Sequence, residues 1–314
     1  MIEKYLKHYP CDFCGSIEYI VLFQGKDLME QLPGQFQMVR CNSCGLIRQN
    51  PRLEWVDLEK YYPPSHGSYK PLLPNSSSMI ERVVSRYGHW KRVNLVNKYV
   101  PSGDWLEVGC GSGLILQEAL FRNNWRLKAI EPNQQVAKYV QDNLNIPVMP
   151  IPFEEYTAEV ESFDVITMWD VLEHLPDPAN ALQKVNRLLR NDGVFIFQIP
   201  NYESWNRKIF KNVWNGYDLP RHLYLFPKKP LHKLLTDLGF CIIKQTCVAG
   251  SHGALILDLT FWLRVNNSKI VEKIVAKGPE FIPFRLLTSI PLWITDKLRL
   301  GSNITIIAQK IVEK

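Results

Sequence analysis

Residues Trp105 to Gly113 read W-L-E-V-G-C-G-S-G, and the rest of the chain is best understood from this segment. A short apolar run leads into glycines at positions 109, 111 and 113, and an acidic residue, Glu107, stands just before them. Glycine adopts positive φ without strain and lets the backbone approach a ligand closely. The pattern predicts a strand-to-helix turn that holds a cofactor, although dinucleotide-binding turns and plain tight turns look similar.

Strand-like and helical patterns alternate on both sides of this turn. Strands are expected at 104–108, 126–130, 148–151, 163–168, 194–199, 240–248 and 303–311, and helices at 79–99, 112–122, 134–143, 179–189 and 227–238. Asn191-Asp192-Gly193 is expected to stop the helix that precedes the fifth strand. Strands that alternate with helices of this length predict an α/β fold with a parallel sheet and right-handed crossovers.

A second acidic residue, Glu131, follows the second strand in the sequence Ala129-Ile130-Glu131-Pro132-Asn133. It lies about 20 residues after the glycine turn, where a carboxylate can accept hydrogen bonds from ribose hydroxyls. These residues alone are compatible with either NAD or S-adenosylmethionine.

Four of the seven cysteines form two C-x-x-C-G turns, Cys11 with Cys14 and Cys41 with Cys44. Two such turns complete a tetrahedral Cys₄ site, and the 26 residues between them are enough for a small hairpin. We expect a structural zinc ion here, with four unligated thiols or a redox pair as the alternatives. Because a closed Cys₄ shell has no open coordination position, this zinc is expected to hold shape rather than to catalyse. The remaining cysteines, Cys110, Cys241 and Cys247, are expected to be small buried hydrophobes.

The chain divides into three parts by composition. We expect a zinc-binding module at 1–50, a Pro- and Tyr-rich linker or lid at 51–78 that ends at the Ser76-Ser77-Ser78 run, and the main domain at 79–314. The main domain is expected to include a substrate-side insertion at about 250–300, which forms a C-terminal helical cover. Within it, the apolar segment 281–294 is too short to span a bilayer. It is interpreted as a hairpin that covers the substrate pocket, an oligomer interface or a peripheral membrane contact.

The composition of the 314 residues is that of an ordinary globular protein, with a formal net charge of +6. This mild basic excess permits an anionic partner without demanding one. Because the first ten residues are charged and lack the apolar core of a secretory signal, we expect a cytoplasmic protein. The sequence leaves the oligomeric state open.

The choice between NAD and S-adenosylmethionine depends on the segment from Phe163 to Pro178, F-D-V-I-T-M-W-D-V-L-E-H-L-P-D-P. Together with L-E-V-G-C-G-S-G and the A-I-E-P strand end, it resembles the class I S-adenosylmethionine-dependent methyltransferases. The resemblance covers about residues 80 to 250. It implies a seven-stranded Rossmann-like sheet whose last strand is antiparallel, with the cofactor across the carboxyl ends of the first, second and fourth strands.

The resemblance also implies cofactor contacts for individual residues. It places Glu107 and the turn with Gly109, Cys110, Gly111 and Gly113 at the methionine end, Glu131 at the ribose hydroxyls, the backbone carbonyl of Trp169 at the amino group, and Phe153, beside Glu154, near the adenine. Pro132 and Asp170 are further expected cofactor contacts.

Asp170, Glu173 and His174 require separate consideration. If the segment after the fourth strand is a helical turn, these residues at i, i+3 and i+4 share one face. They are then expected to form a divalent-metal site, with Mg²⁺ as the candidate ion, or a base constellation in which His174 is catalytic. A related D/E-x-x-E-H pattern occurs in quinone O-methyltransferases of this superfamily. The alternative is that the segment simply fixes the loop.

A second histidine, His222, lies in W-N-G-Y-D-L-P-R-H-L-Y-L-F-P, residues 214–227, after the fifth strand. This pattern resembles a methyltransferase subgroup that also carries N-terminal C-x-x-C pairs, many of them encoded among surface-polysaccharide or secondary-metabolite genes. His222 is expected to be either a general base or a residue that orders this loop.

The sequence therefore predicts O-methylation of a hydroxylated small molecule, such as a sugar or secondary metabolite, with His222 or His174 as base. One alternative is an RNA methyltransferase, but the N/D-P-P-Y motif of base methylation is missing and the positive charge is dispersed, so a nucleic-acid partner is not expected. Another alternative is a non-catalytic scaffold that binds S-adenosylmethionine without turnover.

Overall fold

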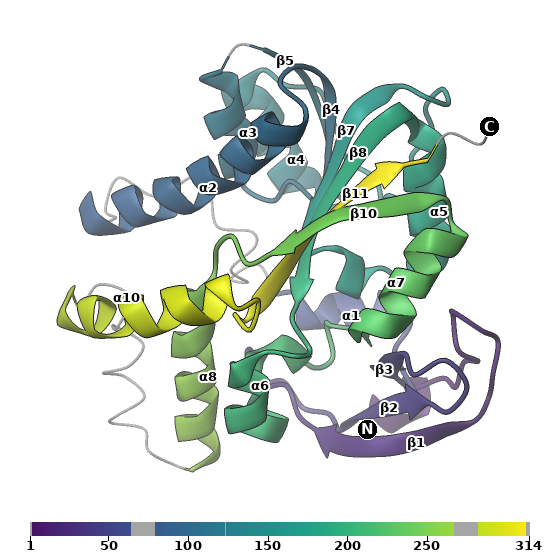
Figure 1. The fold of residues 1–314 in the computed structure, drawn as a ribbon. Helices are drawn as coiled ribbons and strands as arrows, with labels where there is room; N and C mark the ends of the chain where they lie inside the picture. Colours follow the sequence, from purple (N-terminus) through teal and green to yellow (C-terminus); the bar gives the residue numbers. More distant parts are fainter. Residues whose placement is uncertain (1, 64–78, 123, 267–281, 312–314) are drawn as a thin grey trace.

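The computed structural model describes residues 2–63, 79–122, 124–266 and 282–311 (Figure 1). The main sheet has seven strands in the order β10-β11-β8-β7-β4-β5-β6. Its strands are β4 (Gly103–Val108), β5 (Trp125–Ile130), β6 (Val148–Met149), β7 (Phe163–Trp169), β8 (Leu189–Pro200), β10 (Phe240–Thr246) and β11 (Asn303–Lys310). Neighbouring strands from β6 to β8 are parallel, whereas β11 runs antiparallel to both β8 and β10. The predicted α/β fold with an antiparallel last strand is confirmed.

Helices cover both faces of this sheet (Figure 1). Their bounds are α2 (Met79–Tyr99), α3 (Leu114–Leu120), α4 (Gln134–Leu144), α5 (Pro178–Leu188) and α7 (Lys228–Asp237). Because successive strand residues face opposite sides, Trp105 packs with α2, α3 and α4 in one core, while its neighbour Leu106 packs with α5 and α7 in the other. These expected helices are all present, with ends that differ from the prediction by up to two residues.

The helix expected to end at 189 ends within one residue of that position, but Asn191-Asp192-Gly193 does not separate it from the fifth strand, which begins before the expected residue 194. Helix α5 ends at Leu188 and β8 begins at Leu189, so these residues form a bulge inside the strand, where Asp192 has a φ of 61°. Arg190 explains the early start, because its guanidinium pairs with Asp104 and Asp164 on the neighbouring strands. A turn-like sequence is thus held in the sheet by a cross-strand ion pair.

A second, four-stranded sheet lies at the N-terminus, in the order β1-β2-β3-β9. Strands β1 (Tyr19–Gly25) and β2 (Phe36–Cys41) form the hairpin expected between the cysteine pairs, and β3 (Ile47–Gln49) follows. The fourth strand, β9 (Tyr224–Leu225), comes from the segment after β8 and pairs antiparallel with β3. Residues 2–50, called the N-terminal module below, therefore share a sheet with the segment that carries His222.

The remaining elements connect or cover these sheets. They are α1 (Trp55–Leu58), α6 (Trp205–Phe210), α8 (Ser251–Val265), α10 (Ile282–Lys297) and the short 3-10 turns η1 (Ile2–Tyr5), η2 (Glu59–Tyr61), η4 (Leu172–His174), η5 (Lys211–Val213) and η6 (Asn215–Tyr217). Helices α8 and α10 pack together as the C-terminal cover. The hairpin expected at 281–294 is wrong, because residues 282–294 lie in helix α10, which continues through Pro291. Residues 64–78 of the expected linker, with its serine run, and residue 281 lie outside the described part. Among the described residues, no helix combines the length and the apolar character needed to cross a bilayer.

Candidate active site

The glycine turn lies at the carboxyl end of β4, between β4 and α3. Gly109 has a φ of 70°, and a Cβ there would lie 2.6 Å from Cγ2 of Val171. Gly113 has a φ of 75° at the start of α3, and a Cβ there would lie 2.9 Å from Cγ1 of Val140. Gly111 also has positive φ, at 49°. A side chain at position 109 or 113 is disfavoured both by conformation and by space, so the backbone of the turn is free to approach a ligand closely.

Glu131 is buried at the end of β5 and joins two loops. One carboxylate oxygen accepts the N–H of Gly111 at 3.0 Å and the other accepts the N–H of Asn133 at 3.0 Å. Burial raises its pKa, and these two hydrogen bonds oppose that shift. Since a carboxylate oxygen can accept more than one hydrogen bond, Glu131 can still receive hydroxyl groups. Pro132, next in the chain, is exposed.

Glu107 is almost fully buried on β4, and its Oε2 has no hydrogen-bond partner among the described residues. Burial raises its pKa to about 8, against the opposing influence of Arg92. A buried carboxylate with an unused oxygen is costly unless a partner is supplied. Glu107 is therefore prepared for a donor group that comes from outside the protein.

Arg92, on α2, is a site residue that the sequence analysis missed. Its Nη2 lies 3.9 Å from Oδ2 of Asp170, its guanidinium carbon lies 5.4 Å from the ring centroid of Trp169, and its Nε is buried without a partner in the described residues. Burial lowers its pKa, while Asp170 and Glu107 raise it. The helical pattern of 79–99 contains several basic residues and gives no reason to select this one.

Cys110 and Phe153 are placed differently from the other predicted cofactor residues. The Cys110 side chain is buried in the core between the sheet and helices α2 to α4, where burial raises its pKa. The Phe153 ring is buried in the opposite core, and Lys184 donates to its carbonyl at 2.9 Å. Both side chains pack inside the protein, so these two residues have mainly backbone atoms to offer a ligand.

The predicted shared face of Asp170, Glu173 and His174 does not form as expected. Asp170 has a φ of 57° and precedes the 3-10 turn η4, which begins at Leu172. Its carboxylate instead accepts two hydrogen bonds from Nε2 of Gln198, at 2.9 and 3.1 Å. A left-handed residue at the strand end turns the carboxylate toward β8 rather than along a helical face.

Glu173 and His174 are joined by His222. The rings of the two histidines lie 4.6 Å apart between centroids, and one ligand-type atom from each of the three residues lies within 4.8 Å of the others. The Nε2 atom of His222 is 4.0 Å from both Oε1 of Glu173 and Oδ2 of Asp218. The two histidines that the sequence offers as rivals thus belong to one cluster.

Hydrogen bonds fix the tautomer of both histidines. Nδ1 of His222 lies 2.8 Å from the carbonyl oxygen of Gly216, and Nδ1 of His174 lies 3.0 Å from the carbonyl oxygen of Arg221 and 3.0 Å from the hydroxyl of Tyr62. A carbonyl oxygen only accepts, so each Nδ1 carries the hydrogen. In the neutral rings, both Nε2 atoms therefore keep a lone pair that can take a proton.

The charge states of the cluster differ from those of exposed residues. Burial, with a smaller effect from His222, lowers the pKa of His174 to about 3. Burial and the nearby carboxylate of Asp170 raise the pKa of Glu173 well above its ordinary value, and both of its carboxylate oxygens lack a partner among the described residues. Near neutral pH, His174 is therefore uncharged, and the surroundings of Glu173 favour its protonated form.

The four N-terminal cysteines also form a cluster. The Sγ atoms of Cys11 and Cys44 lie 3.5 Å apart, as do those of Cys14 and Cys41, and all four lie within 4.8 Å of one another as free thiols. Tetrahedral zinc with Zn–S bonds of about 2.3 Å separates its sulfur ligands by roughly 3.8 Å. The arrangement fits a Cys₄ zinc site.

Comparisons with known proteins agree with this geometry. A family model described as a methyltransferase domain matches residues 82–245, more than half of the chain. The ubiquinone biosynthesis O-methyltransferase of Actinobacillus pleuropneumoniae serotype 5b is 33% identical over 43% of this chain and 58% of its own length, so this chain spans less than two thirds of that relative. The enzyme of the same name from Histophilus somni is 31% identical over 52% of this chain and 73% of its own length. A Galdieria sulphuraria structure, provisionally described as a sarcosine dimethylglycine methyltransferase, shares the fold with a TM-score of 0.50 at 15% identity, over 78% of this chain and 92% of that one.

Proposed function

Because this chain belongs to the class I S-adenosylmethionine-dependent methyltransferases, we propose that it methylates a hydroxyl group of a small molecule, with His222 as the general base. The observation that carries the base assignment is the fixed His222 ring, whose Nε2 lone pair lies 4.0 Å from the buried Glu173. The names of the O-methyltransferase relatives support an oxygen acceptor.

The cofactor is held at the carboxyl ends of β4, β5 and β7. Glu131 accepts the ribose hydroxyls, and the glycine turn lies against the methionine end. Glu107 and the carbonyl of Trp169 take the amino group, while Arg92 neutralises the carboxylate. Two buried atoms without a partner among the described residues support this division of roles. Oε2 of Glu107 lacks a hydrogen-bond donor, which an amino group would supply, and Nε of Arg92 lacks an acceptor, which a carboxylate would supply.

S-adenosylmethionine supplies, when bound, a methyl group activated by the adjacent sulfonium. The protein has to align the acceptor oxygen, exclude water and remove the hydroxyl proton. Nε2 of His222 would take that proton as the acceptor oxygen bonds to the methyl carbon and the bond from that carbon to sulfur breaks. The positive charge lost at sulfur would then be carried by the imidazole. His174, with a pKa of about 3, is a poor base at neutral pH and orders the loop through its Nδ1 hydrogen.

The acceptor is proposed to be a compact hydroxylated molecule, with a sugar or a secondary metabolite as the first choice. The N-terminal cysteines are proposed to bind structural zinc. The cluster of Glu173, His174 and His222 could instead hold a divalent cation such as Mg²⁺. That ion would occupy the lone pair that the base needs, so metal binding and general-base catalysis by His222 exclude each other.

The test is to incubate the full chain with methyl-labelled S-adenosylmethionine and separate panels of sugars, phenols and RNA. We expect S-adenosylhomocysteine and an O-methyl product from a small hydroxylated molecule, identified by mass spectrometry. Methylated RNA as the only product would replace this proposal with the nucleic-acid alternative. Tight cofactor binding without any product would favour the scaffold. Turnover that vanishes with EDTA and returns with Mg²⁺ would replace the base mechanism with a metal one.

A further inference from the structure

Two side chains of the N-terminal module contact the loop that carries His222, although they lie far from it in sequence. We infer that the N-terminal module is part of the acceptor site, and that its Asp27 and Gln49 are positioning residues for His222. The inference rests on the proposed role of His222 as base. It gives the module a function beyond that of a zinc-bound appendage.

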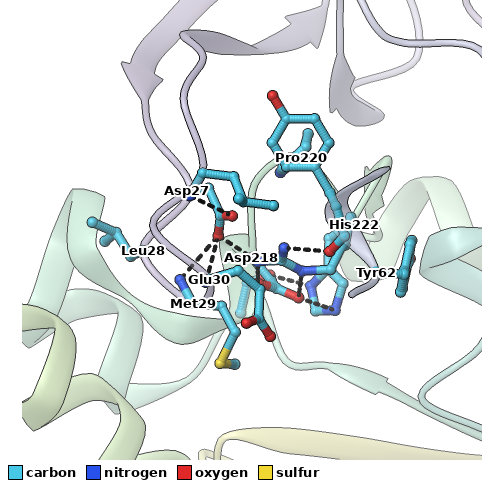
Figure 2. A network of polar contacts seen from close by, with 12 residues as sticks. Asp27, Leu28, Met29, Glu30, Tyr62, Asp218, Pro220 and His222 are labelled. Carbon is cyan, nitrogen blue, oxygen red and sulfur yellow. Dashed lines mark hydrogen bonds and ion pairs between the residues drawn. The ribbon is translucent and has the colours of Figure 1, made fainter. Parts of the chain in front are cut away.

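The first contact is an ion-pair network in the protein interior (Figure 2). The Arg221 side chain is fully buried and donates through Nη2 to Oδ1 of Asp27 at 2.7 Å and to Oδ1 of Asp218 at 2.6 Å. Its Nε donates to the other oxygen of Asp218 at 3.0 Å, and its Nη1 donates to the carbonyl of Tyr61 at 3.1 Å. Arg221, which directly precedes His222, therefore links Asp27 of the module to Asp218, and its contacts with Asp27 and with the Tyr61 carbonyl are buried.

Asp27 is itself rigidly held. Its Oδ1 accepts the backbone N–H groups of Met29 and Glu30 at 3.0 Å each, and its Oδ2 accepts that of Leu32 at 3.2 Å. Arg264 of the C-terminal cover donates to the carbonyls of Leu28 and Met29 in the same loop. The carboxylate that binds Arg221 thus belongs to a loop that is fixed from two sides.

Gln49 provides the second contact, directly to the backbone of the loop. Its Nε2 donates to the carbonyl of Pro220 and to the carbonyl of His222, at 2.8 Å each. Its own backbone N–H donates to the carbonyl of Leu223 at 2.8 Å, where the β3–β9 pairing begins. Gln49 therefore forms hydrogen bonds with the backbone of His222 and with the backbone on both sides of it.

These contacts determine where the His222 ring can point. The Asp218 backbone carbonyl accepts the N–H of His222 at 3.1 Å, and the Gly216 carbonyl accepts its Nδ1 hydrogen. If Arg221 loses Asp27, or if the carbonyls at 220 and 222 lose Gln49, this turn can shift relative to Glu173. Displacing a reacting group by about 1 Å can cost up to about 100-fold in rate, without any loss of cofactor affinity.

The test compares the Asp27→Asn and Gln49→Met variants of the full chain with two control variants in the same module. The asparagine side chain keeps the size of aspartate and one accepting oxygen, so it can retain the N–H groups of Met29 and Glu30 or that of Leu32 but not all three, and it cannot pair ionically. The methionine side chain keeps the length of glutamine without its N–H donor. Glu18→Gln and Gln24→Met are the controls, because these two side chains are exposed. We expect kcat to fall roughly 10- to 100-fold in both test variants, with the S-adenosylmethionine Kd within about twofold of wild type, and no change in the controls.

The deciding readout is the ¹⁵N NMR spectrum of the histidine rings, which needs no acceptor. The His222 signal, assigned by its loss in His222→Gln, should show the Nδ1–H tautomer in the wild type and a mixture of tautomers in both test variants. Unchanged His222 shifts in both variants would overturn the inference, even if turnover fell. Altered shifts in a protein that methylates no hydroxyl would instead leave the positioning intact and remove the proposed function.

Discussion

The proposed cofactor end and the proposed acceptor end of the candidate active site are assembled in different ways. At the cofactor end, the glycine turn and Glu131 directly follow neighbouring parallel strands. At the acceptor end, His222 meets a turn that follows β7 and is held by residues of the N-terminal module. The first region is local in sequence, and the second depends on contacts between distant segments. Changes at one end should therefore affect binding of the donor, and changes at the other should affect turnover.

The strongest test of this division is His222→Gln. Loss of a general base costs about 10²- to 10⁴-fold in rate, so we expect kcat to fall by that amount while calorimetry shows unchanged cofactor affinity. His174→Gln should cost less, because its low pKa already excludes it as a base. The exposed His8 provides the matched control, His8→Gln. Equal losses in the His174 and His222 variants would show that the two rings act as a unit.

Removal of the proposed zinc should produce the next largest effect. Titration with a thiol-modifying reagent, with released metal followed by a colorimetric chelator, should yield one zinc per chain. We expect the treated protein to lose turnover by roughly tenfold or more, because the Cys₄ turns hold the sheet that β9 completes. Cofactor affinity should change much less. If affinity and turnover fall together, the two ends are not independent.

At the cofactor end, Glu131→Gln should weaken the binding of S-adenosylmethionine without lowering kcat at saturating cofactor. An amide cannot accept on both sides, so the variant loses a charge-assisted hydrogen bond, worth roughly 1.5–3 kcal/mol or about a 10- to 100-fold rise in Kd. Calorimetry gives the Kd, and kcat at saturating cofactor gives the control. A fall in kcat at saturation would place Glu131 in the chemical step and break the proposed division.

The pH dependence of cofactor affinity should show the ionisation of the Glu107 carboxyl group. Its pKa is raised from 4.5 to about 8, so the folded protein without cofactor favours the protonated form, and this contribution to stability is lost as pH rises through that range. A cationic amino group favours the ionised form, so affinity should increase by up to about tenfold per pH unit below pH 8. Glu107→Gln should flatten the dependence. An equally steep dependence in the variant would assign it to another titrating group.

The exposed face of α10 should matter least for turnover. Leu286, Leu287, Ile290 and Trp293 are each more than 60% exposed, and a peripheral membrane contact is one of the proposed roles of this face. Leu287→Asp should leave methylation of a water-soluble acceptor within about twofold and reduce sedimentation with anionic vesicles, whereas Ile17→Asp, at an equally exposed site in the module, should change neither. Slower turnover would assign α10 to the acceptor site.

The same division explains what the sequence could predict. Glu107, Glu131 and the glycines stand beside the apolar strands that position them, so strand patterns and motif spacing were sufficient to find them. Arg92 was missed because a helical repeat does not show which of its basic residues faces a buried carboxylate. Asn191-Asp192-Gly193 was misread because the ion pairs of Arg190 that keep it in the sheet involve distant strands.

The acceptor end shows more clearly what could not be predicted from the sequence. Both histidines could be selected as candidates, but their mutual contact depends on how the segment 214–227 folds back over η4. The roles of Asp27 and Gln49 had no signal in the sequence, since neither belongs to a recognisable motif and their partners lie more than 170 residues away. Long-range polar contacts of this kind are decided by the assembled fold.

The pairing of β3 with β9 has a consequence for folding during synthesis on the ribosome. A chain is synthesised from its N-terminus, yet the sheet of the N-terminal module lacks its last strand until residues 224 and 225 have left the ribosome. Until then, β3 presents an open edge on which another chain could pair. The module is thus synthesised before the parallel sheet but completed only after most of it, and a nascent chain that stalls within the parallel sheet would still expose the open edge of β3.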